Sequence, residues 1–334
     1  MLPQTYRKVI AARYDKDFRR AAEIIEVPLE PLKANEVLVR NHYAGVNATD
    51  VNISAGSYTA NSLAPIDLGA EAVGEVVAIG EAVTTVQVGD AVMTSNVGSG
   101  YREYYPVKAH RALRVPAATP EILSLGLSGV TASIGLEVTG EMRSGETVLV
   151  TAAAGGTGQF AVQLAKLAGN HVIGTCSTAD KAELLRSLGC DRVINYKTEN
   201  FAQVLTDEYP NGIGLIYESV GRGMFDTSVD HLAVRGRLVI IGYITEYLDQ
   251  PESVTEPRIY FKLLGKSASI RSMFLPHFFK QVPGHLTKLV DLYESGQLQV
   301  AIDPTEFRGV GAVADAVDYL HSGQSQGKVV VRFP

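Results

Sequence analysis

The sequence predicts an α/β protein in which a doubly wound parallel sheet follows a partly closed β domain. Short strand-like runs separated by Gly, Asn and Pro fill the first third of the chain, and strand and helix patterns alternate from about Ile122 onward. A glycine-rich turn at residues 152–158 joins an apolar run to an amphipathic one. The 334 residues suit two domains, since one hydrophobic core rarely serves a chain of this length.

The first domain is expected to span residues 1–122. Its strand-like runs are rich in β-branched and aromatic residues, and Gly, Asn and Pro between them supply the turns. The expected strands are residues 8–13, 37–43, 72–79, 91–94 and 104–107.

The second domain is expected to span residues 123–275. Its strands are predicted at 148–151, 171–176, 192–195, 214–218, 236–241 and 267–274. Its helices are predicted at 123–138, 159–168, 179–188, 201–208, 223–232 and 257–264. Helical crossovers between strands imply a parallel sheet whose ligand lies at the carboxyl ends of the strands.

The remaining residues, 276–334, are expected to return to the first domain. They carry predicted helices at 285–295 and 313–321 and a predicted strand at 328–332. This organisation places the expected active site in a cleft between two lobes.

The glycine-rich turn has the spacing of a dinucleotide cradle. Ala154, Gly156 and Gly158 occupy the three small-residue positions of a Gly-x-Gly-x-x-Gly-type turn, and Gly155 and Thr157 lie between them. The turn follows a predicted strand and precedes a predicted helix, so small residues let the backbone approach a pyrophosphate at the helix N-terminus. We therefore interpret it as the cofactor-binding turn of a Rossmann-type domain, and a purely structural turn is the alternative.

The end of the next strand indicates which dinucleotide binds. Domains that bind NAD usually place an acidic residue there, whereas this chain has Ser177 and Thr178, with Lys181 on the following helix. Hydroxyl groups and an ammonium suit an extra phosphate, so we predict NADPH. The alternative for Lys181 is an ordinary solvated position on the helix.

Composition excludes several kinds of partner. The net charge is −6, and no dense Lys/Arg cluster appears, so we expect no nucleic-acid surface. We expect that no apolar run approaches the length of a membrane span, and the N-terminus lacks the pattern of a targeting peptide. With only Cys176 and Cys190 present, we expect no disulfide framework and a cytoplasmic location.

Several motifs together resemble the medium-chain dehydrogenase/reductase superfamily. They are Gly45-Val-Asn-Ala-Thr-Asp50, Gly69-Ala-Glu-Ala-Val-Gly-Glu-Val-Val-Ala-Ile-Gly80, Val88-Gly-Asp-Ala-Val92, the glycine-rich turn and Gly327-Lys-Val-Val-Val331. The resemblance implies a GroES-like partly closed β-barrel as the first domain. In the alcohol dehydrogenases of this superfamily, the first two motifs present a cysteine and a histidine to zinc. Here those positions hold Asn47 and Ala70, which cannot replace a thiolate and an imidazole, so we expect no metal.

Within the superfamily, the chain resembles the zinc-free quinone oxidoreductases and the enone reductases. Residues 151–160, 171–177, 187–192, 194–199 and 217–221 resemble the prostaglandin reductases among the latter. This resemblance implies an NADPH-dependent reductase of the carbon–carbon double bond in α,β-unsaturated ketones. The alternatives are an NADPH:quinone oxidoreductase and an NADPH-binding sensor or structural protein with weak catalysis. The expected partners are an apolar small-molecule substrate and a second copy of the chain, because 267–274 is an expected edge strand.

The resemblance also implies particular cofactor residues. Besides the glycine-rich turn, they are Ser177, Lys181 and Tyr196 around the adenosine phosphate, Ser219, Ile241, Tyr247, Met273 and Phe274 around the nicotinamide, and Ser325.

Three side chains are candidates for catalysis. Tyr247 falls where related prostaglandin reductases carry a tyrosine implicated in stabilising the enolate, and a phenol is a neutral donor at working pH. Its alternative is to stack on the cofactor or cover a loop. Asn47 is expected to hydrogen-bond the substrate carbonyl, a water or the nicotinamide amide, or to serve as a turn residue. Tyr58 resembles a tyrosine at the active-site mouth of quinone reductases and is alternatively a packing residue.

Overall fold

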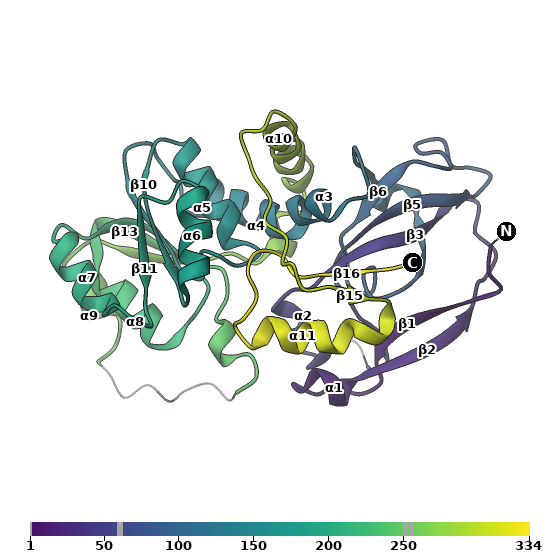
Figure 1. The fold of residues 1–334 in the computed structure, drawn as a ribbon, viewed down its shortest axis with the longest axis horizontal. Helices are drawn as coiled ribbons and strands as arrows, with labels where there is room; N and C mark the ends of the chain where they lie inside the picture. The colour runs from purple at the N-terminus through teal and green to yellow at the C-terminus, as the bar shows by residue number, and fades with distance from the viewer. Residues whose placement is uncertain (1, 59–62, 250–252, 254–256) are drawn as a thin grey trace. The chain divides into compact units, whose positions relative to one another are not determined.

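The computed structural model describes residues 2–58, 63–249, 253 and 257–334, and the chain packs into two compact units (Figure 1). Unit 1 comprises Met1–Leu127 and Ile302–Pro334, and unit 2 comprises Ser128–Ala301. The expected domain boundaries, after residues 122 and 275, differ from these divisions. Residues 276–301 pack in unit 2 because helix α10 (Val282–Glu294) contacts helix α4 (Val130–Ile134).

Unit 2 is built on a six-stranded sheet with the order β11-β10-β9-β12-β13-β14. The strands are β9 (Thr147–Val150), β10 (His171–Cys176), β11 (Arg192–Asn195), β12 (Ile213–Glu218), β13 (Leu232–Ile240) and β14 (Ser269–Ser272). Every neighbouring pair is parallel. The chain builds outward from β9 to β11 and then returns to the other side of β9, so the topological switch point lies between β9 and β12. The expected Rossmann-type sheet is therefore confirmed.

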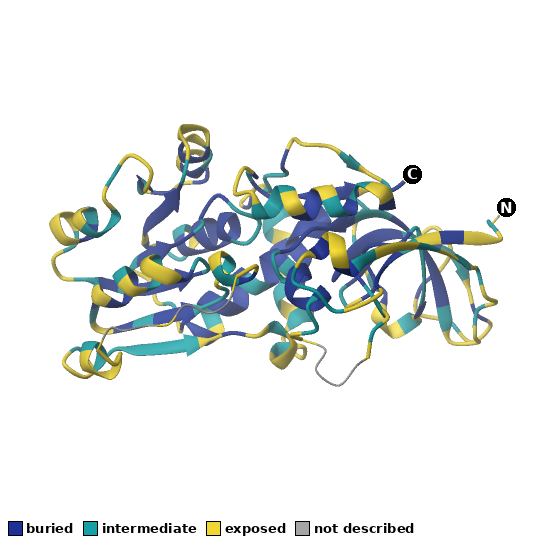
Figure 2. Ribbon diagram, turned by 90° about the horizontal axis from the view of Figure 1, so that it is seen from below, coloured by how far each residue is buried: buried dark blue, intermediate teal, exposed yellow. Residues whose placement is uncertain are grey.

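Short helices connect these strands, and two of them begin at a side-chain cap. Thr178 caps α6 and Asn200 caps α7, each accepting a hydrogen bond from a backbone N–H in the first turn. The strands pack with α7, α8 and α9 in a buried cluster that includes Leu149, Ile173 and Ile216, and Figure 2 shows most strands of this unit in the dark blue of buried residues. The helices are α5 (Gly158–Leu167), α6 (Ala179–Ser187), α7 (Phe201–Glu208), α8 (Arg222–Asp230) and α9 (Tyr260–Leu264).

Unit 1 contains two antiparallel-rich sheets. The larger has seven strands, in the order β15-β16-β3-β5-β6-β8 with β7 paired to β3, and the smaller has the order β2-β1-β4. Strand β2 was not expected, and its residues are mostly exposed or half-buried. The strands are β1 (Thr5–Ala11), β2 (Ala22–Pro28), β3 (Glu36–Gly45), β4 (Ile66–Asp67), β5 (Ala72–Ile79), β6 (Ala91–Thr94), β7 (Tyr104–Lys108), β8 (Leu113–Arg114), β15 (Phe307–Arg308) and β16 (Val330–Arg332).

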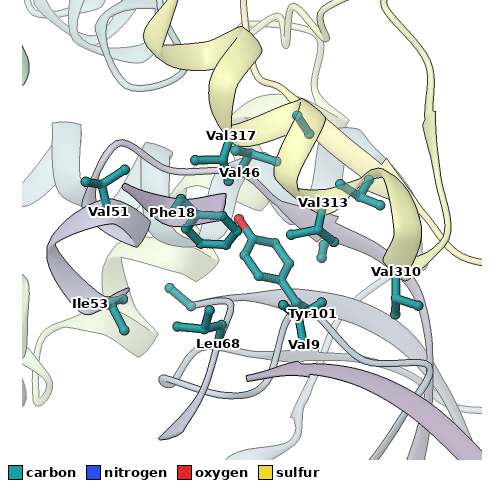
Figure 3. Packing of buried hydrophobic residues seen from close by; sticks show 14 of the residues in the cluster. Val9, Phe18, Val46, Val51, Ile53, Leu68, Tyr101, Val310, Val313 and Val317 are labelled. Atoms are coloured by element: carbon teal, nitrogen blue, oxygen red, sulfur yellow. The ribbon is translucent and has the colours of Figure 1, made fainter. Parts of the chain in front are cut away.

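The core of unit 1 joins segments from both ends of the chain. Helices α1 (Phe18–Ala21), α2 (Thr49–Ser54) and α11 (Val313–His321) pack with the sheets around Tyr101. Figure 3 shows Val313 and Val317 of α11 beside the rings of Phe18 and Tyr101. These two rings meet edge to face, with centroids 6.2 Å apart and planes at 88°.

One helical run, Pro120–Thr139, differs from its predicted form. It begins earlier than predicted because Thr119 caps α3 (Pro120–Ser124) with Pro120 in the first turn, and it contains two π-helical segments, Leu125–Gly129 and Gly135–Thr139. The expectation that no run approaches the length of a membrane span is wrong here, since this helix has 20 residues and is apolar enough by composition. Because 72% of its apolar window is buried inside the fold, these properties are weak evidence for a span.

Candidate active site

The carboxyl edge of the sheet in unit 2 is organised around the switch point between β9 and β12. Thr151 follows β9, and its Oγ1 accepts a hydrogen bond from the backbone N–H of Ser219 at 2.9 Å. Glu218 is 1% exposed and accepts hydrogen bonds from the N–H groups of Val220 and Gly221 at 2.9 and 3.1 Å. Burial raises the pKa of Glu218, and these N–H groups act in the opposite direction. Glu218 therefore holds the turn that presents Ser219.

The glycine-rich turn has the close backbone packing that the motif requires. A Cβ on Gly158 would lie 2.5 Å from the Ala152 carbonyl oxygen and 2.7 Å from the Ala153 Cα, so only glycine fits. Helix α5 begins at Gly158, and the side chain of Thr157 makes no capping hydrogen bond to the helix. The turn thus brings small residues and a ten-residue helix N-terminus to the edge of β9, an arrangement that suits a pyrophosphate.

The predicted adenosine-phosphate residues gather at the adjacent ends of β10 and β11. Cys176 and Asn195 are register partners, so Ser177 and Tyr196 leave neighbouring strands at the same level. Lys181 lies in the first turn of α6 and is 8% exposed. Burial raises the pKa of the Cys176 thiol, and the nearby charge of Lys181 opposes this shift. The structure therefore brings Ser177, Lys181 and Tyr196 to one part of the sheet edge.

The predicted nicotinamide residues follow β12, β13 and β14. Ile241 and Met273 extend the ends of β13 and β14, and their backbone N–H groups bond Glu218 O at 2.8 Å and Ile240 O at 3.0 Å. Phe274 comes next and is 40% exposed. With Ser219, these residues line the carboxyl edge at the strands where the cofactor was expected.

Tyr247 lies in the loop after β13 and is only 7% exposed. Its ring meets that of Tyr243 edge to face at 4.7 Å, and its hydroxyl accepts a long 3.4 Å hydrogen bond from the Tyr243 N–H. A Cβ on Gly242 would lie 2.7 Å from the Tyr247 oxygen, so glycine makes room for this hydroxyl. The loop therefore folds the phenol back toward the end of β13.

Unit 1 contains a buried polar cluster around Asn47. The Lys328 ammonium donates to Asn47 Oδ1 and to Glu71 Oε1, both at 2.7 Å, and Asn47 Nδ2 donates to Glu71 Oε1 at 3.1 Å. The Asn47 N–H donates to Asp50 Oδ2 at 2.8 Å, and the Tyr101 hydroxyl donates to the same oxygen at 2.5 Å. None of the five residues is more than 9% exposed.

Asp50 has an unusual environment within this cluster. Burial raises its pKa from the ordinary 3.8 to about 7, although the hydrogen bonds from Tyr101 and the Asn47 N–H act in the opposite direction. Its Oδ1 is buried and, within the described residues, has no hydrogen-bond partner. Burial and the adjacent Asp50 carboxyl hold the pKa of Tyr101 well above its usual range. The pKa of Asp50 therefore lies near neutral pH.

The other two predicted residues of unit 1 have different surroundings. Tyr58 is 40% exposed, and its hydroxyl accepts a 3.3 Å hydrogen bond from Asn52 on α2. Ser325 precedes β16 and is 8% exposed.

Sequence reasoning assigned no role to Lys328 or Asp50, and it linked Tyr101 only to the shape of the substrate pocket. Lys328 is bonded to Glu71, which precedes it by 257 positions, so no local spacing indicates the pair. The sequence did contain one signal for this pair. Glu71 directly precedes the apolar run Ala72–Ile79, and Lys328 directly precedes Val329–Val331. A charged residue next to a buried strand requires an opposite charge nearby.

Comparison with known proteins places this geometry among dehydrogenases and reductases. Residues 33–117 match the model of an alcohol dehydrogenase GroES-like domain, and residues 156–294 match that of a zinc-binding dehydrogenase. The chain is 44% identical to the prostaglandin reductase-3 of Mus musculus, over 100% of the chain and 91% of the relative. It is 42% identical to the "Probable quinone oxidoreductase" of Leishmania amazonensis, over 98% of both chains. The structure of Escherichia coli quinone oxidoreductase complexed with NADPH superposes with a TM-score of 0.84, at 27% identity, over 98% of this chain and 99% of that one.

Proposed function

We propose that this chain, which belongs to the medium-chain dehydrogenase/reductase superfamily, reduces the carbon–carbon double bond of apolar α,β-unsaturated ketones. It is an NADPH-dependent reductase of the enone and quinone type. The observation that carries the choice of enone is the similarity to prostaglandin reductase-3 along the whole chain. Such a reaction needs a hydride at the β-carbon, a donor for the developing enolate oxygen and a proton at the α-carbon.

The carboxyl edge of unit 2 fits the cofactor. NADPH, when bound, supplies the hydride. The glycine-rich turn and the N-terminus of α5 would hold the pyrophosphate, and Ser177 and Lys181 would hold the adenosine phosphate. Ser219, presented by Glu218, would orient the nicotinamide end.

We assign the enolate hydrogen bond to Tyr247. Its hydroxyl lies near the end of β13, in a region shielded from water, where one hydrogen bond to a developing negative charge is most effective. Asn47 is less suited to this task because its Nδ2 already donates to Gly45 O at 3.2 Å and to Glu71 Oε1 at 3.1 Å.

We also propose that the reaction is independent of zinc. Asn47 and Ala70 stand where the superfamily's alcohol dehydrogenases hold a cysteine and a histidine, and no group of three or more His, Cys, Asp or Glu side chains in the described residues suits a metal ion. Asn47 Oδ1 and Glu71 Oε1 already accept hydrogen bonds from Lys328. Dialysis against a chelator should leave the rate of NADPH oxidation unchanged, and loss of activity that added zinc restores would contradict this proposal.

The central test measures NADPH oxidation with an enone and a quinone side by side, together with the products. The proposal expects the saturated ketone from the enone, and quinone turnover without alkene reduction would refute it. Tyr247→Phe should lower kcat for the enone by about a hundredfold, the size of effect seen when one such donor is removed. Tyr243→Phe is the matched control, since its ring packs against Tyr247 in the same loop. Full enone activity in Tyr247→Phe would remove the enolate assignment.

The second candidate function is quinone reduction. It is favoured by the similarity to the Leishmania amazonensis protein along 98% of the chain. Formation of hydroquinone, with the enone recovered unchanged, would support it.

We propose that the protein is a homodimer formed through the edge of unit 2. Strand β14 ends the sheet, and the neighbouring α9 exposes Tyr260, Phe261 and Leu264 by 66%, 80% and 82%. A large apolar surface beside an edge strand is typical of a protein interface. Light scattering should give a dimer mass for the wild type and a monomer mass for Phe261→Ser/Leu264→Ser. Val88→Ser, at another exposed apolar residue, is the control, and an unchanged mass in the double variant would refute this interface.

A further inference from the structure

We propose that Lys328 is a positioning residue, which acts with Glu71 to fix the orientation of the Asn47 side-chain amide. In this orientation, the carbonyl oxygen is the only polar atom of the amide that can still form a hydrogen bond with a ligand. This inference rests on the proposed function, because its test is a change in the proposed reductase activity.

The charges of Lys328 and Glu71 form a buried ion pair. Lys328 is 1% exposed and Glu71 is 0% exposed, and Nζ lies 2.7 Å from Oε1. Glu71 Oε2 also accepts the backbone N–H of Leu127 at 3.1 Å. A buried ion pair is tolerated when it is close and further hydrogen bonded, and this one meets both conditions.

The two charges determine which way the Asn47 amide faces. An ammonium only donates hydrogen bonds and a carboxylate only accepts them, so Oδ1 must face Lys328 and Nδ2 must face Glu71. Rotating the amide by 180° would place N–H against the ammonium and oxygen against the carboxylate. In the observed orientation, the two N–H groups of the amide donate hydrogen bonds to Gly45 O and Glu71 Oε1. Oδ1 keeps one lone pair. Oδ1 is therefore the side-chain atom of Asn47 that can still form a hydrogen bond with a ligand, and it can only accept one.

Backbone packing keeps Glu71 in place. A Cβ on Gly45 would lie 2.1 Å from Glu71 Oε1, and Gly45 is therefore the residue that makes room for the carboxylate. Because its oxygens are held by Lys328, Asn47 and Leu127, Glu71 cannot shift without breaking several hydrogen bonds at once. The orientation of Asn47 is thus set before any ligand binds, which is a form of preorganisation.

A double-mutant cycle tests whether Lys328 and Glu71 act through Asn47. The variants are Asn47→Ala, the charge-balanced Lys328→Met/Glu71→Gln, and the triple variant. Removing both charges avoids leaving one buried charge unpaired, which would destabilise the protein. If the pair acts by orienting Asn47, each change lowers kcat by about tenfold and the triple variant also loses about tenfold, since the shared hydrogen bond is lost only once. KM for NADPH should change by less than about twofold, and far-UV circular dichroism should match the wild type.

Either of two results would overturn the proposal: a loss of about a hundredfold in the triple variant, which shows independent effects, or wild-type kcat in Lys328→Met/Glu71→Gln. Lys328→Leu/Glu71→Gln also removes both charges and serves if the first charge-balanced variant does not fold. It should lower kcat in the wild-type background and have no further effect in Asn47→Ala. A wild type that reduces only quinones would refute the enone function, and the cycle is then measured with the quinone, so the two failures are distinguishable.

Discussion

The buried carboxyl of Asp50 should make the stability of the protein depend on pH in an uncommon direction. Its pKa is about 7 in the folded chain and an ordinary 3.8 when exposed, because burial disfavours the charged form. Between these values the folded state holds a proton that the unfolded state has lost. The free energy of unfolding therefore falls as pH rises from 4 to 7, and the contribution of Asp50 is fully present only below about pH 4. At about 1.4 kcal/mol for each pKa unit, the whole change is ~4 kcal/mol.

Comparison with Asp50→Asn isolates this contribution, because asparagine resembles the protonated acid and does not titrate. Guanidinium unfolding at pH 4, 5, 6, 7 and 8 gives the difference in the free energy of unfolding between variant and wild type. We expect this difference to shift in favour of Asp50→Asn by ~4 kcal/mol from pH 4 to pH 8. Asp291→Asn, at an exposed position of α10, is the matched control and should show a constant difference. A constant difference for Asp50→Asn, or a shift in favour of the wild type, would refute the reasoning.

Three further predictions concern unit 2. Gly158→Ala should lower the free energy of unfolding by about 1–3 kcal/mol and weaken NADPH binding, because the added Cβ would lie 2.5 Å from a backbone oxygen. Calorimetry measures the first effect and fluorescence titration the second. The control is Gly284→Ala, whose Cβ meets nothing within 4 Å. Lys181→Ala should raise KM for NADPH by about tenfold and leave KM for NADH nearly unchanged, as loss of one phosphate contact predicts; equal changes for both cofactors would contradict this. Arg237→Met should lower the free energy of unfolding at pH 7 by about 2–3 kcal/mol, because it leaves the mostly buried Glu146, 2.6 Å away, without its cation; an unchanged denaturation midpoint would count against it.

Elements with a clear periodic pattern were predictable from the sequence. Strand β10 (His171–Cys176) and helix α11 (Val313–His321) begin and end at the predicted residues. Strand β2 was missed because its exposed Glu23, Ile24 and Glu26 do not alternate with buried residues along the chain. Strand β14 (Ser269–Ser272) is shorter than predicted because it pairs with β13 only along the four residues from Arg237 to Ile240.

The candidate site also has one part that the sequence predicted and one part that it did not. The cradle was predictable because Ala154, Gly156 and Gly158 are close in sequence and act through backbone geometry. The cluster around Asn47 was not, because Glu71 and Lys328 meet only after the chain has folded. The roles of Tyr247 and Tyr58 stay predictions, as does the cytoplasmic location, since no contact in the fold tests them.

The cost of burying the polar cluster of unit 1 is itself an argument for function. Replacing a buried ion pair by well-packed apolar side chains is often neutral or stabilising, so stability alone does not explain why Lys328 and Glu71 are charged. Asp50 is destabilising at neutral pH by the same reasoning, because its folded-state pKa is raised to about 7. Groups that lower stability where they lie are expected where chemistry needs them. In our proposal, Lys328 and Glu71 meet such a need by fixing the direction of the Asn47 amide before a ligand binds.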